Sequence, residues 1–199
     1  MISDKDIEKS RETIQQLIKE GSIVEADKKF VDFFLIKAET SLQTAKAILN
    51  VSNSPKLKID LQLQPTYDGY MWVINSAYYS MFYAATALLA KYNHRIKIEQ
   101  GKHALTYHAL IYYFLDLDKK LTKHIVEQYK QAEIEASELL QIAEQKAREK
   151  VEMIKLELNK RRDFTYEMGK IAEKDKANTS INRAQEFLTL VKEMILNKK

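Results

Sequence analysis

Two guanidinium groups, an amide and a phenol lie close together in one short stretch of this 199-residue chain. The stretch runs from residue 159 to 167 and contains Asn159, Arg161, Arg162 and Tyr166. Arginine binds phosphate through paired hydrogen bonds, and aromatic rings stack on nucleic-acid bases. The stretch therefore predicts a phosphate or RNA-backbone site. A basic helix end that is stabilised by the helix dipole is the alternative.

The four histidines offer little for metal chemistry. His103 and His108 are five residues apart, so on a helix they point about 140° away from each other. His124 and Glu127 form a carboxylate–histidine pair in the reverse of the order that di-iron bundles use. Four scattered glycines cannot build a phosphate-binding loop. We therefore expect no metal and no cofactor.

Tyrosines concentrate in two segments and suggest either a core or a pocket. If they line a pocket, its candidate residues are Asn75, Tyr78, Tyr79 and His103. A tyrosine stripe at helical spacing more often fills a core, because each ring buries a large area between helices. The hydroxyl groups would still need partners, and Asn75, Ser76, His103 and His108 are available for that.

The tyrosines at 78, 79 and 83 belong to a segment that carries no charge between Asp68 and Lys91. A helix that is apolar on nearly all sides must be buried on nearly all sides. We expect this helix to begin after a cap at Thr66 and to end near Tyr92. With only four Gly and two Pro in the chain, the other elements should also be long helices. The fold class is predicted as an all-α, up-and-down bundle of about five or six helices with one long helical arm.

The remaining helices are read from caps and from apolar spacing. A first helix is capped by Ser3 and stopped by Gly21, and a second begins at Ser22 or Ala26, with Phe33 on its apolar stripe. Further helices are expected over residues 102–115 and from Asn178 or Thr179 onward. Residues 57–63 alternate apolar and polar side chains, which predicts an extended crossover, with a short helix as the alternative.

Residues 117–160 are expected to form the arm, as one long helix or as two, within a single domain spanning residues 1–199. With Leu140 left out, apolar residues there recur at alternating spacings of four and three from Ile125 to Ala143, which resembles a heptad seam. Such a seam usually needs a partner helix, from the same chain or from a twin subunit. The arm could therefore act as an interaction scaffold.

Composition suggests the compartment. The net charge of +4 is milder than that of a dedicated nucleic-acid binder. The absence of cysteine fits a reducing cytosol, and the N-terminal residues lack the apolar core of a signal peptide. The polar residues inside the apolar central segment argue against a membrane span. We expect a cytoplasmic protein with no membrane association.

Three features of the chain together resemble the HEPN domain family, a small all-helical fold of nucleotide-binding proteins. The first is the run of residues 77–85, Ala-Tyr-Tyr-Ser-Met-Phe-Tyr-Ala-Ala, which is similar to the family's central helix. The second is Lys102-His103, which opens the following helix, and the third is the arginine-containing motif before a final helix. The resemblance covers residues 27–115 and 155–195.

The resemblance implies a homodimer that binds nucleotide or RNA. Many HEPN proteins are metal-independent ribonucleases with an Arg, four to six residues, then a His. Here Tyr166 stands at the four-residue spacing after Arg161, and no His follows His124. A tyrosine, with a pKa of roughly 10, is a poor general base at neutral pH. The expected protein is therefore non-catalytic or weakly catalytic.

Two further expectations follow from the resemblance. Some members pair with a nucleotidyltransferase in toxin–antitoxin or defence systems, and the partner can modify a tyrosine near the motif, which would be Tyr166 here. The catalytic residues are unknown. His103 and Tyr166 are weak candidates, and a ribonuclease that uses His103 or His108 in place of the missing histidine is an alternative.

Overall fold

The structure, a computed structural model, describes residues 1–98, 100–156 and 167–196, and it describes side chains at 1–98, 100–141 and 174–196. Within these ranges the chain forms α-helices, one π-helix and one pair of two-residue strands, so the predicted all-α helical bundle is confirmed. In chain order the elements are α1 (Asp4–Lys19), β1 (Ile23–Val24), α2 (Lys29–Asn53), α3 (Pro55–Asp60), α4 (Tyr70–Lys91), β2 (Arg95–Ile96), α5 (Lys102–Ala109), the π-helix η1 (Leu110–Leu117), α6 (Lys123–Leu156) and α7 (Glu167–Leu196).

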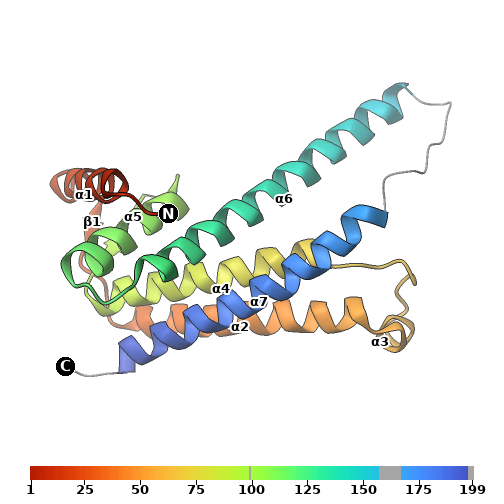
Figure 1. Cartoon of the computed structure of the whole chain (residues 1–199), viewed down its shortest axis with the longest axis horizontal. Coiled ribbons are helices and arrows are strands. Elements are labelled where there is room, and N and C mark those ends of the chain that lie inside the picture. The colour runs from red at the N-terminus through yellow and green to blue at the C-terminus, as the bar shows by residue number, and fades with distance from the viewer. Residues whose placement is uncertain (99, 157–166, 197–199) are drawn as a thin grey trace.

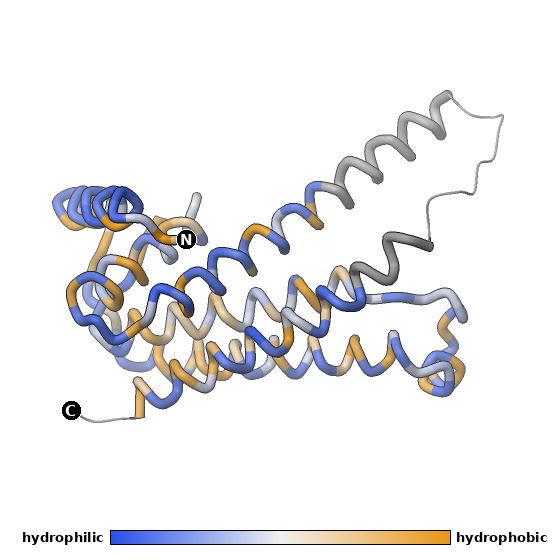
Figure 2. Tube along the Cα trace, in the orientation of Figure 1, coloured by the Kyte–Doolittle hydropathy of each residue, from blue (hydrophilic) through white to orange (hydrophobic). Residues whose placement is uncertain are grey.

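The bundle is built around α4. Helices α2 and α4 run antiparallel, α7 packs along both of them, and α6 crosses α4 before its C-terminal half leaves the bundle (Figure 1). Fifteen of the 22 residues of α4 are buried, and Figure 2 shows the helix as a nearly unbroken apolar to neutral stretch. Alanines at the contact, such as Ala38, Ala45 and Ala84, are fully buried and let the helices approach closely.

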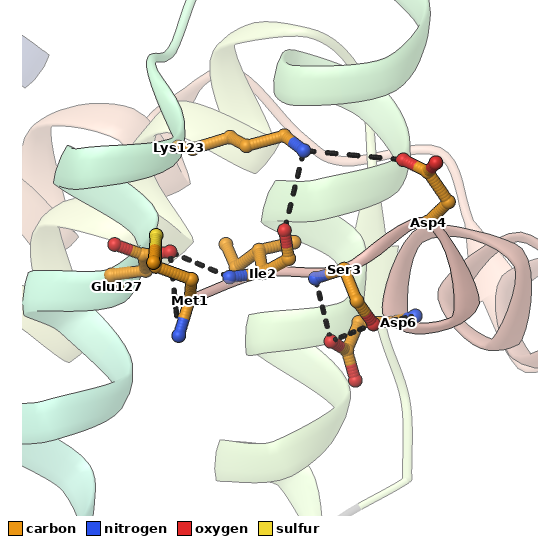
Figure 3. A network of polar contacts seen from close by, with 7 residues as sticks. All are labelled: Met1, Ile2, Ser3, Asp4, Asp6, Lys123 and Glu127. Carbon is orange, nitrogen blue, oxygen red and sulfur yellow. Dashed lines mark hydrogen bonds and ion pairs between the residues drawn. The ribbon is translucent and has the colours of Figure 1, made fainter.

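The N-terminal segment is fixed both to α1 and to α6. The Ser3 side chain and the Asp6 carboxylate cap α1 reciprocally, as predicted for Ser3, and Gly21 follows the helix with φ +68°. The Glu127 carboxylate accepts a hydrogen bond from the Ile2 amide at 2.5 Å, and Lys123 Nζ donates to the Ile2 carbonyl at 3.2 Å (Figure 3). These contacts hold the start of the chain against the first turns of α6.

Three predicted helix boundaries differ from the structure. Helix α2 begins at Lys29, because Ile23 and Val24 instead pair with the strand at 95–96. Helix α4 begins after Gly69, whose amide donates to Ser52 Oγ at 2.9 Å, and not after a Thr66 cap. Helix α7 already begins at Glu167. Inside it, Asn178 and Thr179 donate their side-chain hydrogen bonds to carbonyls four residues earlier instead of capping a helix.

The segment at 57–63 is not extended. Residues 55–60 form the short helix α3, because Ser54 caps it by accepting from the Leu57 amide at 3.2 Å and Pro55 occupies the first helical turn. None of its residues is buried. The apolar alternation therefore reflects surface residues near a turn, and the short-helix alternative is correct.

The predicted helix over 102–115 changes its hydrogen-bond pattern partway. It is α-helical to Ala109 and continues as the π-helix η1, at whose end the Asp118 amide bonds the Tyr113 carbonyl at 3.0 Å. The wider winding brings Leu110, Ile111, Tyr113 and Phe114 into the core together. At the end of the segment, Arg11 of α1 binds Asp116 through two nitrogens at 3.1 and 2.8 Å.

Helix α6 is one continuous helix of 34 residues. Its first apolar positions, Ile125, Tyr129, Ala132 and Ala136, are buried in the bundle, whereas Leu140 is half-exposed. The start of the seam thus packs within its own chain. Among the described residues, none of the helices has both the length and the apolarity that a membrane crossing requires.

Gly69 gives a direct test of the packing between α2 and the start of α4. A Cβ atom at this position would clash with Ile48 Cγ2 and would lie 2.9 Å from the Tyr67 hydroxyl. We expect Gly69→Ala to lower the free energy of unfolding by about 1–3 kcal/mol in urea denaturation. Gly21→Asn is the control, because the space there is open and Asn tolerates a positive φ. A Gly69→Ala protein as stable as this control would contradict the packing.

Candidate functional site

The predicted phosphate-binding residues lie outside the described residues. Asn159, Arg161, Arg162 and Tyr166 belong to residues 157–166, which connect the end of α6 at Leu156 to the start of α7 at Glu167. Their roles therefore remain predictions.

Three of the four predicted pocket residues are brought together where α4, α5 and α6 meet. The Tyr78 hydroxyl and His103 Nδ1 are 2.6 Å apart, a short hydrogen bond. The His103 ring centroid lies 4.2 Å from that of Phe82 and 5.7 Å from that of Tyr79. We call Tyr78, Phe82, His103 and Tyr129 the His103 cluster. The prediction that His103 is a hydrogen-bond partner for a tyrosine hydroxyl is confirmed for Tyr78.

The cluster extends inward to a fully buried phenol. The ring of Tyr129 on α6 lies 6.1 Å from that of Tyr78, and its hydroxyl has no hydrogen-bond partner of good geometry among the described residues. Burial, and then the neighbouring Tyr78, raises the pKa of Tyr129. Burial, and then the Glu133 carboxylate, likewise raises the pKa of Tyr78. Both phenols thus stay protonated at neutral pH.

Glu133 is the charged neighbour of these phenols, and it has its own cation. Its side chain is only 12% exposed, and Lys130 Nζ lies 2.9 Å from its Oε2. The same ammonium group lies 5.0 Å from the centroid of the Tyr107 ring. Lys130 therefore neutralises this carboxylate beside the cluster.

The chemistry open to His103 is limited by its surroundings. Burial lowers its pKa, so the half-buried ring is neutral near pH 7. Because Nδ1 is engaged by Tyr78, only Nε2 can exchange a hydrogen bond with a ligand. The arrangement suits a fixed polar contact more than a free proton shuttle.

The other predicted residues are placed differently. Asn75 is buried on α4, and its Nδ2 has no hydrogen-bond partner among the described residues. Tyr79 contacts His103 through its ring, but the residue is 37% exposed, so it lies at the surface of the bundle. His108 uses Nδ1 for Ser10 Oγ, at 2.9 Å, and the Ser10 hydroxyl itself donates to the Asp6 carbonyl. His108 therefore carries the Nδ1 proton and holds α1 against α5, away from the His103 cluster.

One surface was missed from the sequence. Phe33 was expected in the core, yet it is 48% exposed. Trp72 is also on the surface, at 54% exposure. Together with Tyr79 and Tyr83 they form what we call the ring face, carried by α2 and α4. The missed signal is the register of α2, because the buried positions Val31, Ala38, Leu42 and Ala45 lie on the opposite side of the helix.

The buried histidines predict how stability depends on pH. Burial lowers the folded-state pKa of His94, His103 and His108 below the unfolded value of about 6.5. The unfolded chain then binds protons first as the pH falls, so their contribution is fully present above about pH 6.5 and is lost below it. We expect a lower urea midpoint at about pH 5.5 than at about pH 7.5.

The control for this pH effect is His94→Phe. The His94 ring stacks on Tyr113 at 3.8 Å and 14°, a contact that phenylalanine can keep without titrating. The variant should show a smaller shift of the urea midpoint between the two pH values. Equal midpoints at both pH values in the unaltered protein would contradict the burial of these histidines.

Two open clefts lie beside the start of α6. One of about 730 Å³ faces α7 and is lined by polar side chains such as Thr122, Asn182 and Gln185. Another of about 460 Å³ lies beside the N-terminal segment and includes Glu127 and Arg183. Neither is lined by His103 or Tyr78. Among the described residues, no three acidic or histidine side chains converge as metal ligands would.

The chain was also compared with known proteins. No protein-family model matches it, and no curated protein matches it in sequence.

Proposed function

We propose that this chain is a HEPN-like protein that binds nucleotide or RNA as a cytoplasmic homodimer, with little or no catalysis of its own. A nucleotidyltransferase, in a toxin–antitoxin or defence setting, is the proposed protein partner. The phosphate contacts are assigned to Arg161 and Arg162, with Asn159 and Tyr166 in support.

The observation that carries the proposal is the position of the family-like motif. Residues 77–85 lie in the buried central helix of the bundle, with Tyr79 and Tyr83 as the only members that are not fully buried. The resemblance implied this position for the motif. In the sequence, the arginine motif follows α6 and precedes α7, the last helix that the structure describes.

Weak or absent catalysis is supported by the surroundings of the histidines. The motif itself has Tyr166 in place of a histidine. His103 is bound to Tyr78 through Nδ1, and His108 is bound to Ser10, so neither is a free imidazole. A general base must reach the proton that it removes, and His103 and His108 each have only Nε2 left for that.

The proposal is tested by incubating the protein with end-labelled single-stranded RNA and running the mixture on native and denaturing gels. We expect a retarded band on the native gel and full-length RNA on the denaturing gel. Cleavage that disappears in His103→Ala would replace the proposal with a ribonuclease that uses His103. An RNA that is neither retarded nor cut would favour the interaction scaffold, in which the arm recruits a protein.

A further inference from the structure

The ring face is an exposed aromatic surface with a cation embedded in it. Trp72 and Tyr79 lie seven residues apart on α4, which places them on the same side of the helix, and Tyr83 follows one turn later. The Tyr79 and Tyr83 ring centroids are 5.9 Å apart. Across the groove between the helices, Phe34 of α2 stacks on Tyr83 at 6.2 Å and 17°, and Phe33 lies beside Phe34.

Lys37 ties the two helices together at this surface. Its ammonium nitrogen lies 5.1 Å from the centroid of Phe33 and 5.6 Å from that of Tyr83. Farther along the same side, Arg95 lies over the Phe30 ring at 4.6 Å. Cations over ring faces are attracted by the ring quadrupole, and they remain available to an anion that approaches from solvent.

Few carboxylates lie near this surface, and Asp27, at its Phe30 end, is paired with Lys29 at 2.8 Å. Helix α4 has none, since no charged residue occurs between Asp68 and Lys91. On α2, Asp32 lies about 140° round the helix from Lys37, and Glu39 is paired with Lys192 of α7. A second copy of the chain docked by a two-fold axis that passes beside Lys37 would bring two Lys37 side chains together without an acidic counterpart.

We infer that the ring face is a stacking platform for single-stranded RNA. Every base offers a flat face to exposed Trp72, Tyr79 and Phe33, and the phosphates that link the bases complement Lys37 and Arg95. A protein partner would need carboxylates to match these cations, whereas a nucleic-acid strand supplies rings and anions in one molecule. The inference deepens the proposed function and rests on it, but it adds a surface separate from residues 157–166.

Trp72 reports on this surface directly, because it is the only tryptophan in the chain. We would titrate the protein with an unlabelled oligouridylate of about 12 nucleotides, within the usual site size, and follow tryptophan fluorescence. The expected result is saturable quenching. Phe33→Ala should weaken binding of the same oligonucleotide, measured by anisotropy, about five- to a hundredfold. Trp72→Ala should weaken it by a similar factor.

Ile36→Ala is the matched control, because Ile36 is 62% exposed on the same helix but has no ring. It should bind RNA like the unaltered chain, and light scattering should give the same particle mass for all variants. These positions are exposed, so the variants should keep the helical circular dichroism of the unaltered protein.

The outcomes separate this inference from the proposed function. If RNA binds but tryptophan fluorescence is unchanged and both ring variants bind normally, the ring face is not the platform, and the proposed function stands. If the ring variants lower the particle mass, the face is a subunit interface and the inference is overturned. If the oligonucleotide does not bind at all, both are wrong.

Discussion

Replacing Tyr129 by alanine is expected to lower the free energy of unfolding by about 3–5 kcal/mol, the largest effect on stability predicted here. The side chain is fully buried, and its ring packs between those of Tyr78 and Phe187, with centroids 6.1 and 5.7 Å away. Tyr129 thus joins α6 to both α4 and α7. Alanine would leave a cavity at this junction, and urea denaturation followed by circular dichroism measures the loss.

Tyr129→Phe is the matched control, and it tests the hydroxyl group alone. That hydroxyl is buried without a hydrogen-bond partner of good geometry among the described residues. Removing an unpaired buried polar group is neutral or stabilising, so Tyr129→Phe should be at least as stable as the unaltered protein. A loss of more than about 1 kcal/mol would show that the hydroxyl makes a hydrogen bond, to Tyr78 in the first instance.

The double substitution Arg161→Ala with Arg162→Ala is expected to weaken RNA binding by at least about a hundredfold while leaving the fold intact. Charge-assisted hydrogen bonds from a guanidinium group are each worth roughly 1.5–3 kcal/mol, and about 1.4 kcal/mol corresponds to a tenfold change in Kd. The slope of log binding constant against log salt concentration should also become shallower by about one for each arginine removed. Anisotropy of a labelled RNA, titrated at several salt concentrations, measures both quantities.

Lys174→Ala with Lys176→Ala controls for the loss of net charge. These two exposed lysines of α7 carry the same total charge as the arginine pair, at a different place in the sequence. The lysine variant should bind RNA nearly as well as the unaltered chain. Equal weakening by both double variants would mean that the arginines contribute only general positive charge.

The sequence predicted correctly those parts of the fold that depend on capping residues or on a long segment without charged side chains. The lack of charge between Asp68 and Lys91 predicted a buried central helix, and α4 is that helix. Ser3 and Gly21 marked the ends of α1, because a side-chain cap and a left-handed glycine act within a few residues.

Two errors arose where one local signal competes with another. Alternation at 57–63 suggested an extended chain, but the cap at Ser54 and Pro55 in the first turn make α3 helical. Asn178 and Thr179 are good capping residues, yet they lie inside α7, where their side chains bond back to the preceding turn. Such polar residues mark a helix start only when the preceding backbone leaves the helix.

The candidate site was predictable only in part. The need of a buried phenol for a partner pointed to His103, and Tyr78 uses it. The ring face was not predicted, because an aromatic residue such as Phe33 is assigned to the core by type, whereas its exposure depends on the register of α2 against α4. No sequence rule sets that register without the neighbouring helix.

The central claim, that this protein binds RNA or nucleotide, is tested most directly by titrating a fluorescein-labelled single-stranded RNA with the unaltered protein and following anisotropy. At about 50 mM salt we predict a saturable rise, and at about 200 mM a clearly weaker one, because phosphate contacts release counterions. Anisotropy that stays flat at every salt concentration, up to about 100 μM protein, would contradict the claim, since even non-specific nucleic-acid binding is typically detectable in that range.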